Sequence, residues 1–382
     1  MLWFLEILQQ SNKLKNDDMM IPIAKPLISD EEKKAVIRVL ESGRLTQGKT
    51  VEEFEKKFAS YCDVKYGITT SNGTTALHTA VMALGIEKED EVITSPLSFV
   101  ASSNCLLYVG AKPVFVDIDP KTYNIDPDLI EEKITERTKA ILPVHLYGQP
   151  CDMDKIMKIA RKYNLLVIED ASQAHGAEFK GKKIGSFGNV ACFSFYPTKN
   201  MTTAEGGIVL TNSDDIDNKC RLIRNHGQTD VYYHNVLGFN FRMTEIQAAI
   251  GIEQLKKLNE WNETRIKNAK FLTENLKDLN DIITPYVDSR VKHVFHQYTI
   301  RIKKMSNVDL SKKLEKRGIQ TKIYYPIPIH KQIFYKKLGY NDSLFEAELA
   351  SKEILSIPVH PSLSKGDLEK IVKQLREILR EE

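Results

Sequence analysis

Short apolar runs alternate along the first two thirds of the chain with segments in which apolar residues recur at helical spacing. This alternation is typical of crossover units, in which a helix connects two parallel strands of one sheet. The runs are apolar nearly throughout, as in strands that helices cover on both faces. The sequence therefore predicts a large α/β domain with a mostly parallel sheet over residues 20–250. Its expected strands are 66–72, 90–95, 112–118, 139–146 and 165–170.

The pattern changes beyond residue 250, where a long helical stretch precedes a mixture of shorter elements. Apolar residues recur there every three or four positions, which predicts a connecting helix: Ile266, Ala269, Leu272, Leu276 and Leu279. A strand at 296–302 and a helix at 308–319 follow, and the chain closes with a helix that has one apolar face. These elements predict a smaller α+β domain over residues 251–382. Residues 1–19 are expected to form an N-terminal extension outside the folded core.

The composition limits the classes of molecule that this protein is expected to bind. The chain has 54 Lys and Arg against 51 Asp and Glu, a net charge of +3 that is spread along the sequence, so it lacks the basic footprint of a nucleic-acid-binding protein. Its five cysteines are scattered without CxxC spacing, which predicts neither disulfides nor a metal site and favours a reducing cytoplasm. The apolar run at the N-terminus is too short for a spanning helix and resembles no signal peptide, so no membrane partner is expected.

Lys199 is the first candidate for chemistry. It follows the apolar run 190–195 and precedes a glycine-containing turn, so partial burial is expected to lower the pKa of its amine. A neutral amine can add to a carbonyl and form a Schiff base. A solvated, inert lysine beside a turn is the alternative for such a residue taken alone. Ser194, five residues earlier, offers a hydroxyl that can hold a phosphate.

Two strand ends supply further candidates. Asp170 ends the apolar run 165–170, and ligands of an open parallel sheet bind outside the carboxyl ends of its strands. A carboxylate there can either pair with a protonated pyridine nitrogen or cap a helix. In the segment 69–80 a strand leads through a small-residue turn into a helix whose first N–H groups attract phosphate. The absence of GxGxxG and GxxxxGK[ST] argues against a dinucleotide fold and a P-loop.

Several motifs occur together in a characteristic order: "IPIAKP", "SNGTTALH", "SFVAS", "EDASQAHGA", "SFYPTKN", "EGG", "GFNFRMTEIQAA" and "IPVHP". With them the chain resembles, from Ile21 to Pro361, the nucleotide-sugar aminotransferases of the DegT type, which are fold-type I pyridoxal-phosphate enzymes. The resemblance implies pyridoxal 5'-phosphate as the cofactor and Lys199 as the lysine that forms the Schiff base with it. It also implies that Asp170 faces the pyridine nitrogen, Gln173 the phenolic oxygen and Phe99 the face of the ring.

The resemblance extends to the cofactor phosphate and to the substrate. Gly73 and Thr74 would bind the phosphate at a helix N-terminus, and Ser194 would bind it through its hydroxyl. Asn240 matches a family residue that reaches the phosphate from the neighbouring subunit, which implies a homodimer with shared active sites. 

Two residues are candidates for the substrate side, and each has a structural alternative. His330 resembles a substrate-side histidine but is equally expected as a partly buried structural one. Arg242 can bind a carboxylate or fix its loop, and the structural role is favoured. His175 is given no chemistry. Ala204 departs from the family, which often has Gly at this position, and is expected to tighten the loop slightly without affecting the lysine.

The function implied is a two-step transamination. Glutamate would leave its amino group on the cofactor, and a nucleotide-linked keto sugar, a 4-keto-6-deoxyhexose, would then accept it for the biosynthesis of a surface polysaccharide or glycan. Lys199 would carry the proton as general base and acid. The alternatives are a sugar dehydratase of the same fold, in which histidine replaces the lysine, and a regulatory or binding protein without catalysis.

Overall fold

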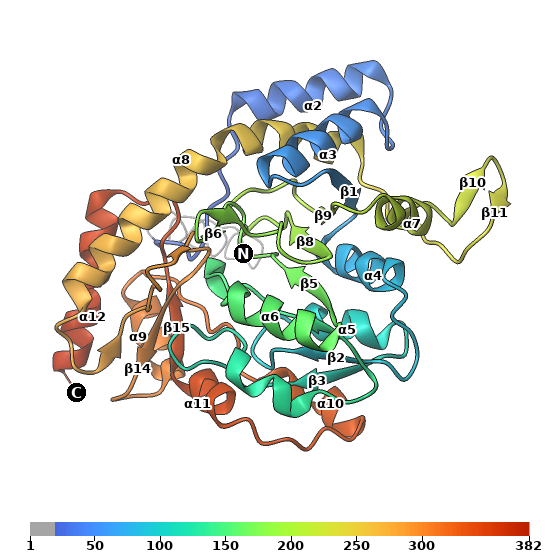
Figure 1. The fold of residues 1–382 in the computed structure, drawn as a ribbon. Helices are drawn as coiled ribbons and strands as arrows, with labels where there is room; N and C mark the ends of the chain where they lie inside the picture. Colours follow the sequence, from blue (N-terminus) through green and yellow to red (C-terminus); the bar gives the residue numbers. More distant parts are fainter. Residues whose placement is uncertain (1–19, 382) are drawn as a thin grey trace, which may run out of the picture.

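A seven-stranded sheet forms the centre of the computed structural model, which describes residues 20–381 (Figure 1). In spatial order its strands are β1 (Tyr66–Thr70), β9 (Gly207–Thr211), β8 (Val190–Ser194), β5 (Leu166–Asp170), β4 (Thr138–Leu142), β2 (Glu91–Thr94) and β3 (Lys112–Phe115). The five strands from β8 to β3 are parallel, whereas β9 runs antiparallel to both β8 and β1. The predicted mostly parallel sheet is therefore confirmed, and β8 and β9 are strands that the sequence pattern did not single out.

Helices cover both faces of this sheet, because successive strand residues point to opposite sides. On β2, Ile93 joins one hydrophobic cluster and its neighbour Val92 joins the other. The first cluster is closed by α3 (Lys49–Tyr61), α6 (Met153–Tyr163) and the start of α8 (Glu245–Leu276), and the second by α4 (Gly73–Ala83), α5 (Ala101–Leu107) and α7 (Asp214–Arg224). This double cover explains why the strand sequences are apolar at almost every position.

Helix α8 connects the large sheet with a third hydrophobic cluster (Figure 1). That cluster lies between the end of α8, the antiparallel strands β12 (Ile282–Ile283), β14 (Tyr298–Ile302) and β15 (Ile354–Ile357), and the helices α9 (Asn307–Lys316) and α12 (Lys365–Arg380). The apolar face expected for α12 is buried there: Leu368, Ile371, Val372, Leu375, Ile378 and Leu379. The division of the chain near residue 250 stays a prediction, and α8 runs continuously through that position.

The remaining elements are short, apart from α2 (Asp30–Ser42), which packs along α8. They are the helices α10 (Ile333–Lys337) and α11 (Phe345–Glu353), the strands β6 (Glu178–Phe179), β7 (Lys182–Lys183), β10 (Gln228–Asp230), β11 (Tyr233–His234) and β13 (Val291–Lys292), and the 3₁₀ turns Pro127–Leu129, Glu131–Lys133, Leu146–Gly148 and Ile329–Lys331. The hairpin of β10 and β11 projects from the body beyond α7 (Figure 1).

Within residues 20–381, all five cysteines are buried and unpaired, and no cluster of His, Cys, Asp and Glu is arranged to hold a metal ion. No helix in that range is long and apolar enough to cross a membrane. The predicted N-terminal extension, residues 1–19, lies outside the described residues.

Candidate active site

The predicted chemistry gathers at the carboxyl end of the parallel strands, where α/β sheets bind ligands. Asp170 is the last residue of β5, and Ser194 is the last residue of the neighbouring β8. The chain then turns through residues 195–199, and the Lys199 amide donates to the Tyr196 carbonyl at 2.9 Å. Strand pairing thus brings three residues, which are separated by up to 29 positions, to one edge of the sheet.

The Lys199 amine has an unusually low affinity for its proton. Burial lowers its pKa from 10.5 to about 8, and the nearby Asp170 carboxylate opposes this shift. With a pKa of about 8, roughly a tenth of the amine is neutral at pH 7, against less than about a thousandth for a solvated lysine. The partial burial that the sequence suggested therefore gives this lysine the nucleophilic form that carbonyl addition requires.

Asp170 is held in a fixed orientation. Only 4% of the residue is exposed. Its Oδ2 accepts a hydrogen bond from the Ser102 hydroxyl at 2.7 Å, and its Oδ1 accepts one from the Ser172 amide at 3.1 Å. Ser102 is in turn 2.7 Å from the Ser98 hydroxyl. Sequence reasoning missed Ser102, although it lies only three residues after Phe99 in the same motif.

One polar and two aromatic side chains lie near Asp170: Gln173, Tyr325 and Phe99. The Gln173 carbonyl oxygen accepts from the Tyr147 amide at 2.8 Å, and its amide group donates to the Tyr325 hydroxyl at 3.4 Å. Burial raises the pKa of Tyr325, so its hydroxyl keeps its proton. The Phe99 ring is 56% exposed and lies 6.3 Å, centroid to centroid, from the Tyr325 ring. An exposed ring at this edge leaves an aromatic face for a planar ligand to stack on. Tyr325 was not predicted from the sequence, because its segment, 324–330, matches neither helical nor strand periodicity.

The turn before α4 packs directly on the end of β8. A Cβ atom at Gly73 would lie 2.6 Å from the Cβ of Ser194, so only glycine permits this approach. The Asn72 side chain accepts from the Thr75 amide at 2.9 Å and begins the helix, whose first turn contains no acidic residue. The Ser194 hydroxyl and the first amides of α4, including that of Thr74, therefore lie side by side in a cradle suited to a phosphate.

The loop 239–242 lies beside this cradle. The Phe241 carbonyl accepts from the Ser71 amide at 2.7 Å, two residues before Gly73. Asn240 is exposed, and its side-chain amide makes no hydrogen bond to another described residue, whereas Arg242 donates to the Asn225 side chain at 2.5 Å. Arg242 thus has a contact that fixes its own loop.

His330 lies in different surroundings. It is buried against the Phe115 ring and its Nε2 is 3.3 Å from Glu348. Within residues 20–381 no recorded contact joins it to Lys199 or Asp170. His175, to which the sequence gave no role, is buried among the rings of Phe58, Phe193 and Phe195.

The residues present fit pyridoxal 5'-phosphate. A low-pKa lysine, an anchored carboxylate, an exposed ring and a glycine-lined helix N-terminus match the aldehyde, pyridine nitrogen, ring face and phosphate of that molecule. Together with the sheet, they define a fold-type I pyridoxal-phosphate enzyme.

A model of the DegT/DnrJ/EryC1/StrS aminotransferase family matches residues 26–376. The chain belongs to this family. It is accordingly a sugar aminotransferase, and its cofactor is pyridoxal 5'-phosphate.

Three similar proteins illustrate the relationship. The pleiotropic regulatory protein of Geobacillus stearothermophilus is 45% identical, over 92% of this chain and 96% of its own. The GDP-perosamine synthase of Caulobacter vibrioides is 42% identical, over 94% of this chain and 98% of its own. The crystal structure of DesV from S. venezuelae superposes with a TM-score of 0.90 at 36% identity, covering 94% of this chain and 99% of that one.

Proposed function

We propose that this aminotransferase moves an amino group from glutamate to a nucleotide-linked keto sugar, a 4-keto-6-deoxyhexose, in the biosynthesis of a surface polysaccharide or glycan. The observation that carries the proposal is Lys199, a low-pKa amine beside an anchored carboxylate in a chain of this family. The same lysine argues against the dehydratase alternative, in which histidine takes its place. The name of the Caulobacter relative, which records a GDP-linked amino sugar, supports the substrate class.

The bound cofactor supplies an electron sink for the carbon that loses a proton. We assign the pyridine nitrogen to Asp170, because Ser102 and the Ser172 amide hold that carboxylate in place. Gln173 would face the phenolic oxygen, and Phe99 would cover one face of the ring.

The phosphate would lie in the cradle of α4 and β8. Gly73 and Thr74 would offer backbone amides, and Ser194 its hydroxyl. A phosphate is favoured at a helix N-terminus because unpaired N–H groups and the helix dipole both attract negative charge.

Lys199 would also move the proton during transfer. Its Nζ, once free, would take up the proton that the substrate carbon loses, as general base, and return it as general acid. A pKa of about 8 suits both directions near neutral pH, because neither the protonated nor the neutral form is scarce.

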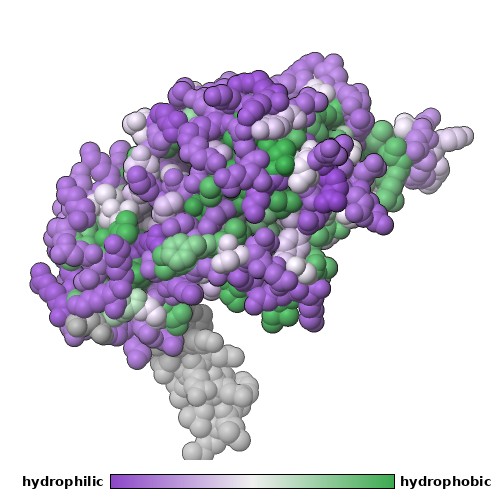
Figure 2. Space-filling view, turned by 60° about the horizontal axis from the view of Figure 1, so that its bottom comes forward, coloured by the Kyte–Doolittle hydropathy of each residue, from purple (hydrophilic) through white to green (hydrophobic). Residues whose placement is uncertain are grey.

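We further propose a homodimer whose active sites are shared. The projecting hairpin and the segment that follows it expose apolar side chains that a monomer would leave in water: Val231, Tyr232, Tyr233 and Leu237. Figure 2 shows this projection standing clear of the rest of the surface, with apolar atoms where it joins the body. A contiguous exposed apolar patch is typical of a protein–protein interface. Asn240, a few residues further along, would then reach the phosphate of the partner.

Two finer assignments follow the site geometry. Arg242 is proposed to fix its loop through Asn225, and His330 is proposed to serve the substrate side. We place the enzyme in the cytoplasm, which the five buried, unpaired cysteines support.

The direct test incubates the protein with glutamate and a panel of nucleotide keto sugars and measures the amino sugar by mass spectrometry. We expect one or a few 4-keto-6-deoxyhexoses to be aminated, and borohydride to fix the cofactor on the peptide that contains Lys199. Lys199→Ala serves as the blank, and Lys65→Ala, a surface lysine paired with Asp214, as the matched control. A pyridoxyl group on another lysine would overturn the site assignment. Failure of every sugar with glutamate would overturn the substrate assignment.

A further inference from the structure

A pocket lies beside Lys199, between the loop that carries this lysine and α8. Its walls are the segment 24–27 before α2, the loop 197–202 and one face of α8 that carries Gln254, Trp261 and Arg265. No Asp or Glu lines it, whereas Lys25, Lys199 and Arg265 do. Three basic side chains around one pocket create a field that attracts an anion.

Arg265 is the unusual member of this group. Only 5% of the residue is exposed, and it forms no ion pair with any residue of the described chain. One Nη1 hydrogen bond reaches the Phe295 carbonyl at 3.3 Å, while the buried Nε has no acceptor. A buried charge without a counter-ion is costly, and proteins as a rule pair such groups. The guanidinium therefore has unfilled hydrogen-bonding capacity at a pocket wall.

The charge on Arg265 persists despite burial. Burial lowers its pKa to about 10, so the guanidinium stays protonated at neutral pH. His360, whose pKa is lowered to about 4 by burial and by Arg265 and Lys25, is neutral under the same conditions, so it adds no second positive charge beside Arg265. Arg265 is thus a charged group that no acidic side chain of residues 20–381 neutralises.

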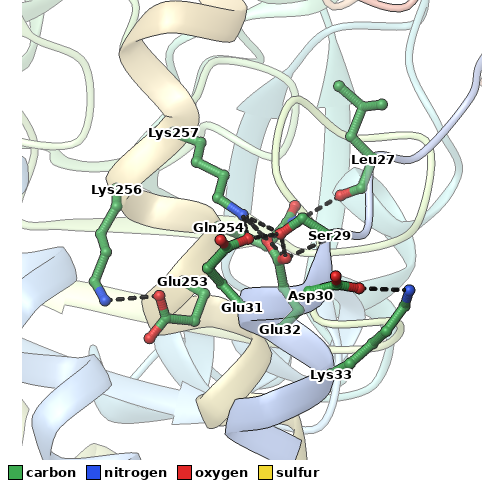
Figure 3. A network of polar contacts seen from close by, with 10 residues as sticks. All are labelled: Leu27, Ser29, Asp30, Glu31, Glu32, Lys33, Glu253, Gln254, Lys256 and Lys257. Carbon is green, nitrogen blue, oxygen red and sulfur yellow. Dashed lines mark hydrogen bonds and ion pairs between the residues drawn. The ribbon is translucent and has the colours of Figure 1, made fainter.

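The pocket walls are fixed in place by a polar network (Figure 3). The Gln254 amide donates to the Leu27 carbonyl and to Glu32, both at 2.8 Å, and its carbonyl accepts from the Thr202 amide at 3.2 Å. Lys257 pairs with Glu32 at 2.9 Å. These bonds tie the segment before α2, the Lys199 loop and α8 together. The segments that form the pocket walls are thus held together before a ligand binds, which lowers the cost of binding.

We propose that this pocket is an anion subsite in which Arg265 and Lys25 bind a carboxylate of the amino donor. The donor's identity rests on the proposed function. A guanidinium fork matches a carboxylate in bidentate geometry, and Lys199, which the donor amine replaces, forms part of the same pocket. A phosphate of the sugar nucleotide has the same anionic chemistry and is the second source that the experiment separates.

The first experiment measures binding without turnover. Glutarate, an unreactive dicarboxylate, and inorganic pyrophosphate are titrated separately into the cofactor-loaded protein, and the melting temperature gives the affinity of each. We expect glutarate to bind the wild type and its affinity to fall at least tenfold in Arg265→Gln, with partial recovery in Arg265→Lys. Arg376→Gln, which removes a surface arginine paired with Asp278, should bind glutarate as the wild type does.

The titration tests both the anion subsite and the assignment of its ligand as a carboxylate. Equal glutarate affinity in the wild type and Arg265→Gln would overturn the proposal, as would a wild type that binds neither glutarate nor pyrophosphate. A wild type that binds pyrophosphate alone, with loss in Arg265→Gln, would overturn the carboxylate assignment in favour of the sugar nucleotide. Should Arg265→Gln fail to fold, Lys25→Ala on the exposed rim replaces it, and unchanged glutarate affinity there would overturn the proposal.

The second experiment follows the two half-reactions by the absorbance of the cofactor. We expect Arg265→Gln to raise the glutamate concentration needed for half-maximal rate at least tenfold, with little change in the limiting rate or in the keto-sugar half-reaction. Glutamine, which lacks the distal carboxylate, shows which carboxylate Arg265 contacts. If Arg265→Gln weakens the use of glutamate but not of glutamine, Arg265 binds the distal carboxylate. If it weakens the use of both donors equally, Arg265 binds the α-carboxylate. If glutarate binds through Arg265 but glutamate is no donor, the proposed function fails while the subsite stands.

Discussion

At the carboxyl end of β5 the side chains are buried and hydrogen bonded to one another, whereas on the β10–β11 hairpin they are exposed to solvent. Asp170, Gln173 and Ser102 each have a protein partner within one chain. By contrast, Tyr232 is 87% exposed and Leu237 is 72% exposed. The first region makes these contacts within a single copy of the chain. The second has the character of a surface that becomes buried only on association.

The largest expected effect concerns the buried region at the end of β5. Lys199→Ala removes both the group that bonds to the cofactor and the proton carrier, so we expect each half-reaction to slow by about 10³-fold or more, in line with the usual worth of a positioned acid–base group. Stopped-flow absorbance measures this, and borohydride should no longer fix the cofactor. A variant with near wild-type rates would show that the chemistry lies elsewhere.

Removing exposed apolar side chains from the hairpin region is expected to weaken the association of two chains. The double variant Tyr232→Ser, Leu237→Ser removes apolar area that would be buried in a dimer, and at ~25 cal/mol per Å² we expect the dimer to dissociate at least tenfold more readily. Sedimentation at several concentrations measures this. Phe334→Ser, another exposed apolar residue remote from the hairpin, is the control. A wild type that is monomeric and fully active would contradict the shared site.

The next prediction concerns Asn240, which would reach from one subunit to the cofactor phosphate of the other. Asn240→Ala removes a hydrogen bond to phosphate worth about 1.5–3 kcal/mol, so cofactor should be retained roughly 10- to 150-fold less tightly and excess cofactor should partly restore activity. When Lys199→Ala and Asn240→Ala chains are refolded together, each mixed dimer should regain one of its two sites. Since the Asn240 loop also lies beside the cradle of its own chain, no recovery in mixed dimers would assign Asn240 to that chain instead.

A smaller effect tests the burial of Lys199 without catalysis. Its pKa is about 8 when folded and 10.5 otherwise, so the unfolded chain holds the proton more tightly, and the penalty is fully present below pH 8. Lys199→Met should stabilise the cofactor-free protein by about 2 kcal/mol at pH 7, allowing for partial exposure. This advantage should shrink as the pH rises from 8 to 10.5, measured by denaturant unfolding. Lys34→Met on the surface controls for the loss of a lysine, and a constant difference across this range would contradict the burial.

The smallest effect concerns the loop after Lys199. Ala204 adopts a φ of +68°, a left-handed conformation that costs a residue with a Cβ roughly 1 kcal/mol relative to glycine. Ala204→Gly should therefore stabilise the protein by about 0.5 kcal/mol, after the extra entropy of an unfolded glycine is subtracted. The denaturation midpoint measures this. A lower midpoint would mean that the alanine methyl group has a packing role.

Sequence and structure agree where local pattern is decisive. The strand ending in Asp170 was predicted because burial on both faces makes it apolar throughout, and the apolar face of α12 because burial on one side imposes a period that is readable in the sequence. β8 and β9 were not singled out, although β8 carries Ser194. β9 pairs antiparallel with both neighbours, which the expectation of repeated parallel crossover units did not anticipate.

The amino-acid sequence by itself determined the α/β class and the family, and it pointed to Lys199 as the candidate for the chemistry, because these depend on periodicity and on motifs of adjacent residues. Only the tertiary structure decided that Ser102 holds Asp170, that Tyr325 meets Gln173 across 152 positions, and that Arg265 is buried without an acidic partner in the described chain. The physical reason is that such contacts depend on where strands and helices pack. That packing is set by the burial of the whole core, and no stretch of neighbouring residues contains it.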